Sequence, residues 1–410
     1  MARNRTLAII QAGGAGSRLD VLTRERAKPA LPFGGVYQLV DFPLSNLSHS
    51  GIDDVWLSVQ FQAGSLEEQV ANGRPWDLDR NRGGFRLLVA EEGTGSADED
   101  GFAAGNADQL FRIRDQIRDH DPDLVIICSA DHVYRFDFAD AIATHHEKSA
   151  ECTVITTEVP IRDASEHATV ESNRLGRVTD FRYKPGRAKT GTVATEIFVY
   201  DPQVLLTVVE ELHHERSGEA GAEGGDTGLG DFGEHLLPRL VERGRVYTHA
   251  MPGHWRDVGT PESYLAGHLD LLTEDVGLFD DPSWPILSRQ PQRMPARLVR
   301  GSAVEDSLVS PGCRVRGSVR RSVLGPGVVV EKGATVSDSV VLADVVISSG
   351  ATVSWSVVDS GCRIERNATV GDQALEKVDP DRIVLMGRES VVGPDGIVEP
   401  GARLEPGTTA

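Results

Sequence analysis

Over the N-terminal part of the chain, short apolar runs alternate with stretches in which apolar residues recur at helical spacing. Such runs, bounded by Gly, Pro and Asp, are typical of buried strands, and the intervening pattern is typical of helices that pack on a sheet. We predict strands at 7–11, 54–59, 124–129, 152–158 and 196–200, and helices at 40–48, 65–69, 107–118, 139–148 and 232–243. Gly-rich, polar stretches at 91–106 and 215–230 are expected to be mobile loops. The alternation favours an α/β domain with a parallel or mixed sheet covered by helices on both faces.

The apolar pattern changes after a stretch that contains four prolines, Pro282, Pro285, Pro291 and Pro295. Short triplets rich in Val, Ile and Cys then begin at residues 313, 328, 345 and 362, with spacings of 15, 17 and 17 residues. A period of this size is about three hexapeptides, which is one coil of a left-handed parallel β-helix. The sequence therefore predicts an α/β domain at 1–272, a linker at 273–297 and a β-helix of four or more coils at 298–410.

Two roles are open for the predicted β-helix. Hexapeptide coils can support assembly, or they can form an acyltransferase site that commonly uses a histidine. No histidine occurs from Gly301 to Ala410. This favours structure and assembly over acyl transfer.

Composition narrows the function classes. The chain has 410 residues and a formal net charge of -20, which argues against a nucleic-acid surface because phosphate backbones require clustered Lys and Arg. The four cysteines have no metal-binding spacing and are expected to be reduced, buried thiols. No signal peptide precedes the first strand and no apolar run is long enough to span a bilayer. We expect a cytoplasmic protein that does not enter a membrane.

Chemistry is concentrated directly after the first predicted strand. Gly13, Gly14 and Gly16 allow backbone N–H groups to turn toward an anion, and Arg18 and Lys28 add fixed positive charge. The spacing matches neither GxxxxGK[ST] nor GxGxxG, so an ordinary NTPase loop or dinucleotide site is disfavoured. A phosphate-rich ligand is expected here.

Several longer motifs carry a resemblance. They are GGxGxRL, RAKPALPFGG, the run YQLVDFPLSN, an aspartate after the third predicted strand, and WRDVGT at 255–260. Together they resemble the sugar-phosphate nucleotidylyltransferases, and within them the glucose-1-phosphate adenylyltransferases, along nearly the whole chain. The resemblance implies a Rossmann-like nucleotidyltransferase domain followed by a left-handed β-helix. It also implies transfer of a nucleotidyl group from ATP to a sugar 1-phosphate, most simply glucose 1-phosphate, in glycogen or glucan biosynthesis.

The resemblance also implies roles for individual residues. Arg18 and Lys28 would meet the triphosphate, Asp131 and Asp257 would hold Mg²⁺, and Lys184 would meet the sugar phosphate. Gln60 matches a position near the adenine base, while His132 is interpreted as a structural loop histidine. The expected assembly is a homo-oligomer, most simply a tetramer, or a hetero-oligomer with an active paralogue.

The sugar side departs from the family pattern. Tyr183 replaces a glutamate, Ala194 replaces a serine, and Ala168 and Glu196 each replace a glycine. Such changes alter which sugar hydroxyls find partners. Two alternatives to glucose 1-phosphate turnover therefore stay open: a different sugar, or a catalytically weak homologue that binds sugar phosphates and regulates a partner subunit.

Overall fold

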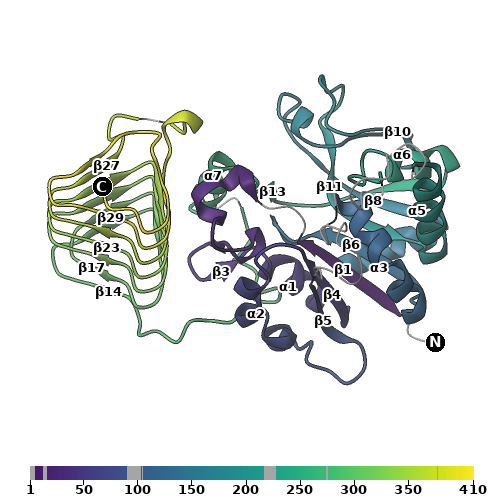
Figure 1. Cartoon of the computed structure of the whole chain (residues 1–410), viewed down its shortest axis with the longest axis horizontal. Coiled ribbons are helices and arrows are strands. Elements are labelled where there is room, and N and C mark those ends of the chain that lie inside the picture. The colour runs from purple at the N-terminus through teal and green to yellow at the C-terminus, as the bar shows by residue number, and fades with distance from the viewer. Residues whose placement is uncertain are drawn as a thin grey trace, which may run out of the picture.

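The computed structural model describes residues 5–12, 16–89, 103, 105–216, 228–273, 276–375 and 377–410. Within these residues the chain forms an α/β domain followed by a parallel β-helix (Figure 1). None of the helices in this part of the chain has the length and apolar character needed to cross a bilayer. All four cysteines are buried and free, as expected.

The first domain is built on a nine-stranded mixed sheet. Its strands are β1 (Thr6–Ala12), β4 (Asp54–Val59), β5 (Gly84–Val89), β6 (Leu124–Ser129), β8 (Cys152–Glu158), β9 (Thr169–Ser172), β10 (Val178–Arg182), β11 (Thr192–Tyr200) and β12 (Val246–Ala250). β1 lies between β4 and β6 and is parallel to both, whereas β11 is antiparallel to β6. The carboxyl ends of β1, β4 and β6 therefore share one edge, where α/β sheets place their ligands.

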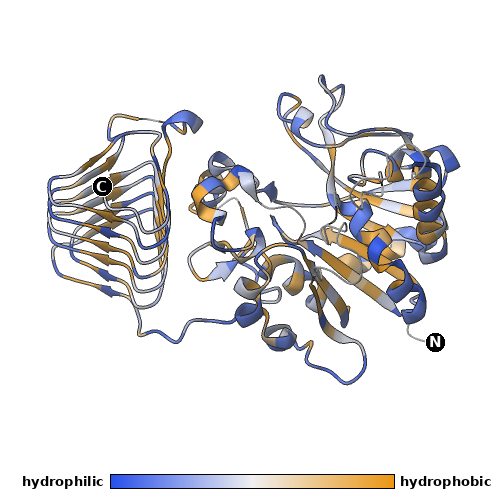
Figure 2. Cartoon of the chain, in the orientation of Figure 1, coloured by the Kyte–Doolittle hydropathy of each residue, from blue (hydrophilic) through white to orange (hydrophobic). Residues whose placement is uncertain are grey.

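Helices cover both faces of this sheet. One layer holds α1 (Asp41–His49), α2 (Gly64–Val70) and α4 (Phe138–Lys148), and the other holds α3 (Asn106–His120), α5 (Pro202–Arg216) and α6 (Leu236–Arg243). Successive residues of β1 serve opposite layers: Leu7 and Ile9 pack with α3, α5 and α6, while Ala8 and Ile10 pack with α1, α2 and α4. The central strands β1, β4 and β6 accordingly form the centre of the domain's hydrophobic core (Figure 2).

Most predicted elements are confirmed, three strands with the same bounds. One helix differs, because α6 begins at Leu236 rather than at residue 232. Residues 231–235 instead form a turn in which Glu234 N donates to Asp231 O at 3.1 Å. Most of the two predicted mobile loops lies outside the described residues.

The proline-rich segment from residue 276 to residue 296 packs on the first domain. Leu278 and Ile286 are buried. Trp284 Nε1 donates to Asn46 Oδ1 at 2.9 Å, and Leu287 N donates to Ser45 Oγ at 2.9 Å, so the segment is anchored on α1.

The C-terminal domain is the predicted left-handed parallel β-helix, with three six-stranded parallel sheets as its faces. The first face is β14 (Arg297–Leu298), β17 (Arg314–Val315), β20 (Val329–Val330), β23 (Val346–Ile347), β26 (Arg363–Ile364) and β29 (Val391–Val392). The second is β15 (Ala303–Glu305), β18 (Ser318–Arg320), β21 (Thr335–Ser337), β24 (Thr352–Ser354), β27 (Thr369–Gly371) and β30 (Ile397–Val398). The third is β16 (Leu308–Val309), β19 (Val323–Leu324), β22 (Val340–Val341), β25 (Ser356–Val358), β28 (Val384–Met386) and β31 (Arg403–Leu404). Val, Ile and Ala of successive coils stack into one apolar core.

The β-helix contacts the segment that carries the phosphate-binding candidates. The 3₁₀ segment η1 (Ser17–Thr23) packs against β28 and β31. Next to it, Arg26 and Asp359 form an ion pair in which both side chains are buried. Arg24 and Glu405 form a second, exposed pair at 3.0 Å.

Candidate active site

Two short strands bring the predicted metal-binding aspartates together. β7 (His132–Tyr134) pairs antiparallel with β13 (Trp255–Asp257), and Asp257 lies opposite His132. One potential ligand atom from each of Asp131, His132 and Asp257 lies within 4.8 Å of the others. Residues separated by more than a hundred positions are thus joined by a strand pair that the hydrophobic pattern did not predict.

Lys28 occupies the same cluster. It lies on η2 (Lys28–Ala30), its side chain is buried, and its Nζ forms an ion pair with Asp131 and lies 3.8 Å from Asp257 Oδ1. Burial alone would lower the pKa of the Lys28 ammonium, but the two carboxylates outweigh burial and raise that pKa. Burial would likewise raise the pKa of Asp131, yet Lys28, His132 and hydrogen bonds from Lys28 and Ser129 hold that pKa below its usual range.

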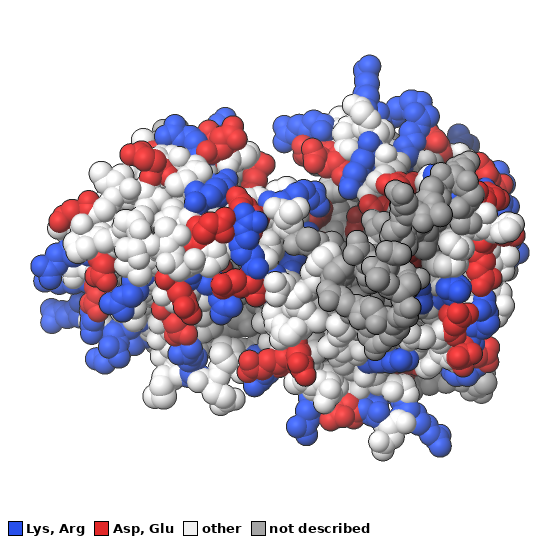
Figure 3. Space-filling view, viewed as in Figure 1, with Lys and Arg blue, Asp and Glu red and all other residues white. Residues whose placement is uncertain are grey.

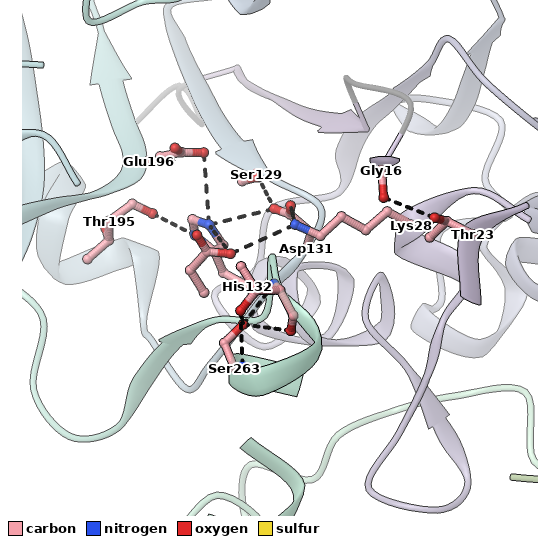
Figure 4. Close-up of polar contacts among 11 residues, drawn as sticks. Gly16, Thr23, Lys28, Ser129, Asp131, His132, Thr195, Glu196 and Ser263 are labelled. Carbon is pink, nitrogen blue, oxygen red and sulfur yellow. Dashed lines mark hydrogen bonds and ion pairs between the residues drawn. The ribbon is translucent and has the colours of Figure 1, made fainter. Parts of the chain in front are cut away.

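His132 lies at the centre of three carboxylates (Figure 4). Its Nε2 is 3.6 Å from Asp131 Oδ1 and 3.9 Å from both Glu196 Oε2 and Asp257 Oδ1, while its Nδ1 contacts Thr195 O at 3.0 Å. Burial alone would lower the pKa of His132, but the carboxylates outweigh it and raise that pKa. The sequence interpretation of a loop histidine is therefore wrong in position, because His132 is a buried strand residue within the site.

Arg18 and Gly259 complete this corner. A Cβ added at Gly259 would lie 2.9 Å from Asp257 Oδ1, 3.2 Å from Arg18 Nη2 and 3.3 Å from Lys28 Nζ. Glycine is thus the residue that lets this backbone pass between a carboxylate and two cations.

The cluster opens into a cavity of about 310 Å³ at the carboxyl edge of the sheet. Its lining is mainly polar and comes from segments spread along the first domain. The lining residues are Gln11, Arg18, Gln60, Ala103, Gly105, Asn106, Ser129, Asp131, Tyr183, Lys184, Glu196, Asp231 and Phe232. On the face of the molecule viewed in Figure 3, acidic and basic side chains are interspersed, so positive charge is not gathered into one extended patch there.

One wall of the cavity is formed by Tyr183 and its neighbours. The Tyr183 hydroxyl donates to Asp231 Oδ2 at 2.7 Å, and Asn106 N donates to Asp231 Oδ1 at 3.2 Å. Burial and the Asp231 carboxylate raise the pKa of Tyr183, so the phenol stays protonated. Lys184 Nζ lies 4.8 Å from the centre of the Tyr183 ring. Gln60 also lines the cavity, and its Oε1 accepts from Ala103 N at 2.9 Å.

Most of the residues proposed from the sequence converge here. Arg18, Gln60, Asp131 and Lys184 line one cavity, and Lys28 and Asp257 cluster with Asp131. Gly16 adopts φ 67° and precedes η1. Gly13 and Gly14 lie outside the described residues.

Only two of the four residues that differ from the family pattern on its sugar side line the cavity. Tyr183 and Glu196 line the cavity, whereas Ala194 is buried and Ala168 packs against the same apolar layer. Asp231 was missed because it lies between the Gly-rich stretch 215–230 and the helix that the sequence predicts from residue 232. The only feature of the sequence that could have indicated a site residue here is an acidic side chain directly before Phe232.

The carboxylate pair fits a hard divalent cation. Oxygen ligands are those that Mg²⁺ prefers, and it commonly takes one or two carboxylates plus substrate phosphates. Among the described residues, the buried Asp257 Oδ1 has no hydrogen-bond partner, although Asp131 lies close by. An unsatisfied buried oxygen beside a second carboxylate is what such an ion would satisfy.

Comparison with known proteins agrees with this geometry. The family model described as nucleotidyl transferase matches residues 7–274, and the one described as GlmU-like, C-terminal hexapeptide matches residues 294–401. Fold and site thus define a nucleotidyltransferase with a hexapeptide-repeat β-helix.

The curated relatives are more specific. A glucose-1-phosphate adenylyltransferase of Clostridium acetobutylicum is 35% identical over 82% of this chain and 86% of its own length. Proteins of the same name from Nitrosospira multiformis and Desulforamulus reducens are 38% and 34% identical, over 82% and 84% of this chain and 82% and 83% of their own lengths. The chain therefore belongs to the glucose-1-phosphate adenylyltransferase family.

Proposed function

We propose that the protein transfers the adenylyl group of ATP to glucose 1-phosphate, giving ADP-glucose for glycogen or glucan synthesis and releasing pyrophosphate. The observation that carries the proposal is the convergence of Arg18, Asp131 and Lys184 on one cavity, backed by Asp257 and Lys28. A sugar-phosphate oxygen forms a bond to the α-phosphorus of ATP while the bond from that phosphorus to the bridging oxygen of pyrophosphate breaks.

This reaction brings two anions together, so charge neutralisation and positioning supply most of the acceleration. We assign Arg18 and Lys28 to the triphosphate and Lys184 to the sugar phosphate. Asp131 and Asp257 would hold Mg²⁺, which when bound neutralises the triphosphate. Lys28, paired with both aspartates, would hold their carboxylates in place.

We assign Gln60 to the adenine base. Because its Oε1 accepts from Ala103 N, its NH₂ group is the end that can donate to a ring nitrogen of adenine. Gln60→Leu should raise the KM for ATP about tenfold with a smaller change in kcat.

We further propose that the protein works in the cytoplasm as a homo-oligomer, most simply a tetramer, or together with an active paralogue. The repeated faces of the β-helix would supply the subunit contacts. Sedimentation of the purified chain tests this: a monomer at micromolar concentration would contradict self-assembly.

The proposal is tested by pyrophosphate release across a panel of nucleoside triphosphates and sugar 1-phosphates. We expect release with ATP and a glucose-type 1-phosphate, and only in the presence of Mg²⁺. Binding of ATP without release of pyrophosphate with any sugar would instead support the alternative of a regulatory subunit, which the changed residues Tyr183 and Glu196 favour.

A further inference from the structure

Tyr183 and Lys184 directly follow β10, and both line the cavity. Consecutive residues of an extended strand point to opposite sides, so one of the two would face away if β10 simply continued. Lys184 instead has a φ of 40°, in the left-handed region that residues other than glycine rarely adopt. The chain therefore turns here, and Lys184 Nζ lies 4.8 Å from the centre of the Tyr183 ring.

The Tyr183 side chain is held at both ends. A Cβ added at Gly233 would lie 2.6 Å from Tyr183 Cγ, so the ring fits only because Gly233 has no side chain. At the other end, the hydroxyl donates to Asp231 Oδ2 at 2.7 Å. Asp231 is itself fixed on the first residue of α3, because Asn106 N donates to its Oδ1 at 3.2 Å. The structure thus sets the place of the phenol oxygen in the cavity wall.

The bond to Asp231 also determines what the Tyr183 hydroxyl can offer a ligand. A tyrosine hydroxyl can donate its one proton and can also accept hydrogen bonds. Burial and the Asp231 carboxylate raise the pKa of Tyr183, so the phenol keeps its proton and donates it to Asp231. A hydrogen bond to a carboxylate is stronger than one to a neutral hydroxyl. The phenol oxygen can therefore accept from a ligand but has no proton left to donate.

A hexose 1-phosphate matches this arrangement. With its phosphate at Lys184, its ring would lie beside Tyr183, because the Lys184 ammonium is 4.8 Å from the centre of the phenol ring. Each sugar hydroxyl can donate one hydrogen bond, which the phenol oxygen can accept. A sugar that lacks the contacting hydroxyl would leave this oxygen without a partner from the ligand, which lowers affinity.

We propose that Tyr183 accepts a hydrogen bond from one hydroxyl of glucose 1-phosphate, and that Asp231 fixes Tyr183 in this role by taking the phenol proton. Tyr183 is thus a specificity-determining residue, and Asp231 is a positioning residue that acts through it. This inference rests on the proposed adenylyl transfer to glucose 1-phosphate and deepens it.

The test is the kcat/KM of the full chain with ATP, Mg²⁺ and either glucose 1-phosphate or its 2-deoxy, 3-deoxy, 4-deoxy and 6-deoxy analogues. The ratio of glucose 1-phosphate to each analogue measures what the missing hydroxyl contributes. Tyr183→Phe keeps the ring and removes the acceptor. It should lower one of these ratios about tenfold and leave the others unchanged. It should also raise the KM for glucose 1-phosphate more than the KM for ATP.

Tyr247→Phe is the matched control. It removes a hydroxyl from a half-buried tyrosine of β12 that is not among the residues lining the cavity. Every ratio should stay unchanged in this variant. The ratios separate a sugar contact from any general loss of folding or turnover, because both sugars are measured on the same protein.

A deoxyfluoro analogue at the position so identified tests the direction of the hydrogen bond. Fluorine fills the place of the hydroxyl but cannot donate, so the parent should use this analogue as poorly as the deoxy sugar. In Asp231→Asn, Asn106 N still requires the side-chain oxygen, which leaves the amide NH₂ to donate to the Tyr183 oxygen. The phenol proton is then free for the ligand, and the disadvantage of the deoxyfluoro sugar should fall about threefold or more.

Three results would overturn the inference. Unchanged ratios in Tyr183→Phe, whether or not overall efficiency falls, would refute the sugar contact while leaving adenylyl transfer intact. An unchanged disadvantage of the deoxyfluoro sugar in Asp231→Asn would show that Asp231 does not fix the direction of this bond. Absence of pyrophosphate release with every sugar would refute the proposed function itself, and the inference with it.

Discussion

Among single residues, Lys28 is central to the site, because its buried ammonium group pairs with both Asp131 and Asp257. Removing one member of a buried charge group leaves the others uncompensated, which is more damaging than the loss of an exposed pair. The same cluster also limits what the adjacent backbone can carry, since Gly259 passes between Asp257, Arg18 and Lys28.

Gly259→Ala should therefore reduce activity without unfolding the protein. The new methyl group would lie 2.9 Å from Asp257 Oδ1, so the carboxylate must move by a few tenths of an ångström. Misplacement of this kind should lower kcat about 10- to 100-fold. Gly64→Ala is the matched control, because nothing lies within 4 Å of its added Cβ. Equal activity in both variants would show that the corner tolerates the methyl group.

His268 should make the protein sensitive to acid. It is fully buried in α7 (Pro261–Asp270) against Phe33 and Tyr264, and burial lowers its pKa to about 4. The pKa of an unfolded histidine is about 6.5, so below that value the unfolded chain binds the proton more readily than the folded one. This contribution to stability is complete above about pH 6.5 and is lost as the pH falls toward 4, by roughly 3 kcal/mol.

Urea unfolding midpoints of the parent and of His268→Gln at pH 7.5 and pH 5 check this prediction. The variant should lose less stability between the two pH values than the parent. His145, whose pKa burial also lowers to about 4, titrates in the same direction and leaves part of the acid sensitivity in place. The same pH dependence in parent and variant would contradict the role of His268.

At the scale of elements, the start of α7 holds the WRDVGT run in position. Thr260 caps this helix: Ser263 N donates to Thr260 Oγ1 at 3.1 Å and Thr260 N donates to Ser263 Oγ at 2.9 Å. This capping box fixes the chain three residues after Asp257.

Thr260→Ala should lower the free energy of unfolding by about 1 kcal/mol. It should also raise the Mg²⁺ concentration needed for half-maximal activity, because Asp257 is less firmly held. Thr260→Ser, which keeps the hydroxyl, is the control. A normal Mg²⁺ requirement in Thr260→Ala would separate the cap from the site.

The length of each element determines how well the sequence predicts it. The buried strands 54–59, 124–129 and 152–158 were predicted with their observed bounds, because continuous apolar runs between turn residues leave few alternatives. β7 and β13 were missed because three-residue strands carry too little pattern, and their pairing depends on tertiary contacts. The roles of Asp131 and Asp257 came from the resemblance, since no spacing rule relates them.

Asp231 and Glu196 reach the cavity because the backbone locally departs from the regular element that the sequence predicts. Asp231 reaches the cavity because residues 231–235 turn before α6, against the helical pattern that was predicted to begin at 232. The cavity position of Glu196 depends on a local strand irregularity that periodicity cannot show. Ala194 and Ala168, which differ from the family pattern on its sugar side, pack with the apolar layer and are not among the residues that line the cavity.

At the scale of the whole molecule, the β-helix supports the segment that carries Arg18. η1 packs on β28 and β31, and the buried Arg26–Asp359 pair joins the two domains two residues before Lys28. Substitutions that weaken this interface should therefore also displace Arg18 and Lys28 and lower activity.

Asp359→Ala should lower the free energy of unfolding by about 3 to 5 kcal/mol, because it leaves the Arg26 guanidinium buried without its partner. Activity should fall as well, and the double variant Arg26→Met, Asp359→Leu should recover part of the stability. Glu405→Gln, which disrupts the exposed pair with Arg24, should change stability by less than about 1 kcal/mol. Similar thermal denaturation midpoints for Asp359→Ala and Glu405→Gln would contradict the structural role of the buried pair.

Deletion of the chain from residue 297 onward should likewise abolish the proposed assembly or cause aggregation, because it exposes the surface of η1 that packs on β28 and β31. Size-exclusion chromatography of the truncated chain checks this. A soluble, fully active first domain of unchanged oligomeric state would assign the β-helix another role.

The proposed reaction is the transfer of the adenylyl group of ATP to a sugar 1-phosphate in the cavity. It is tested with ATP labelled at the α-phosphorus or at the β-phosphorus, incubated with Mg²⁺ and glucose 1-phosphate. We expect the α label in the nucleotide sugar and the β label in pyrophosphate, in equal amounts, and we expect Asp131→Asn to reduce both by a factor of about 100 or more. Undiminished transfer in Asp131→Asn, or appearance of the label only in products of ATP hydrolysis, would contradict it.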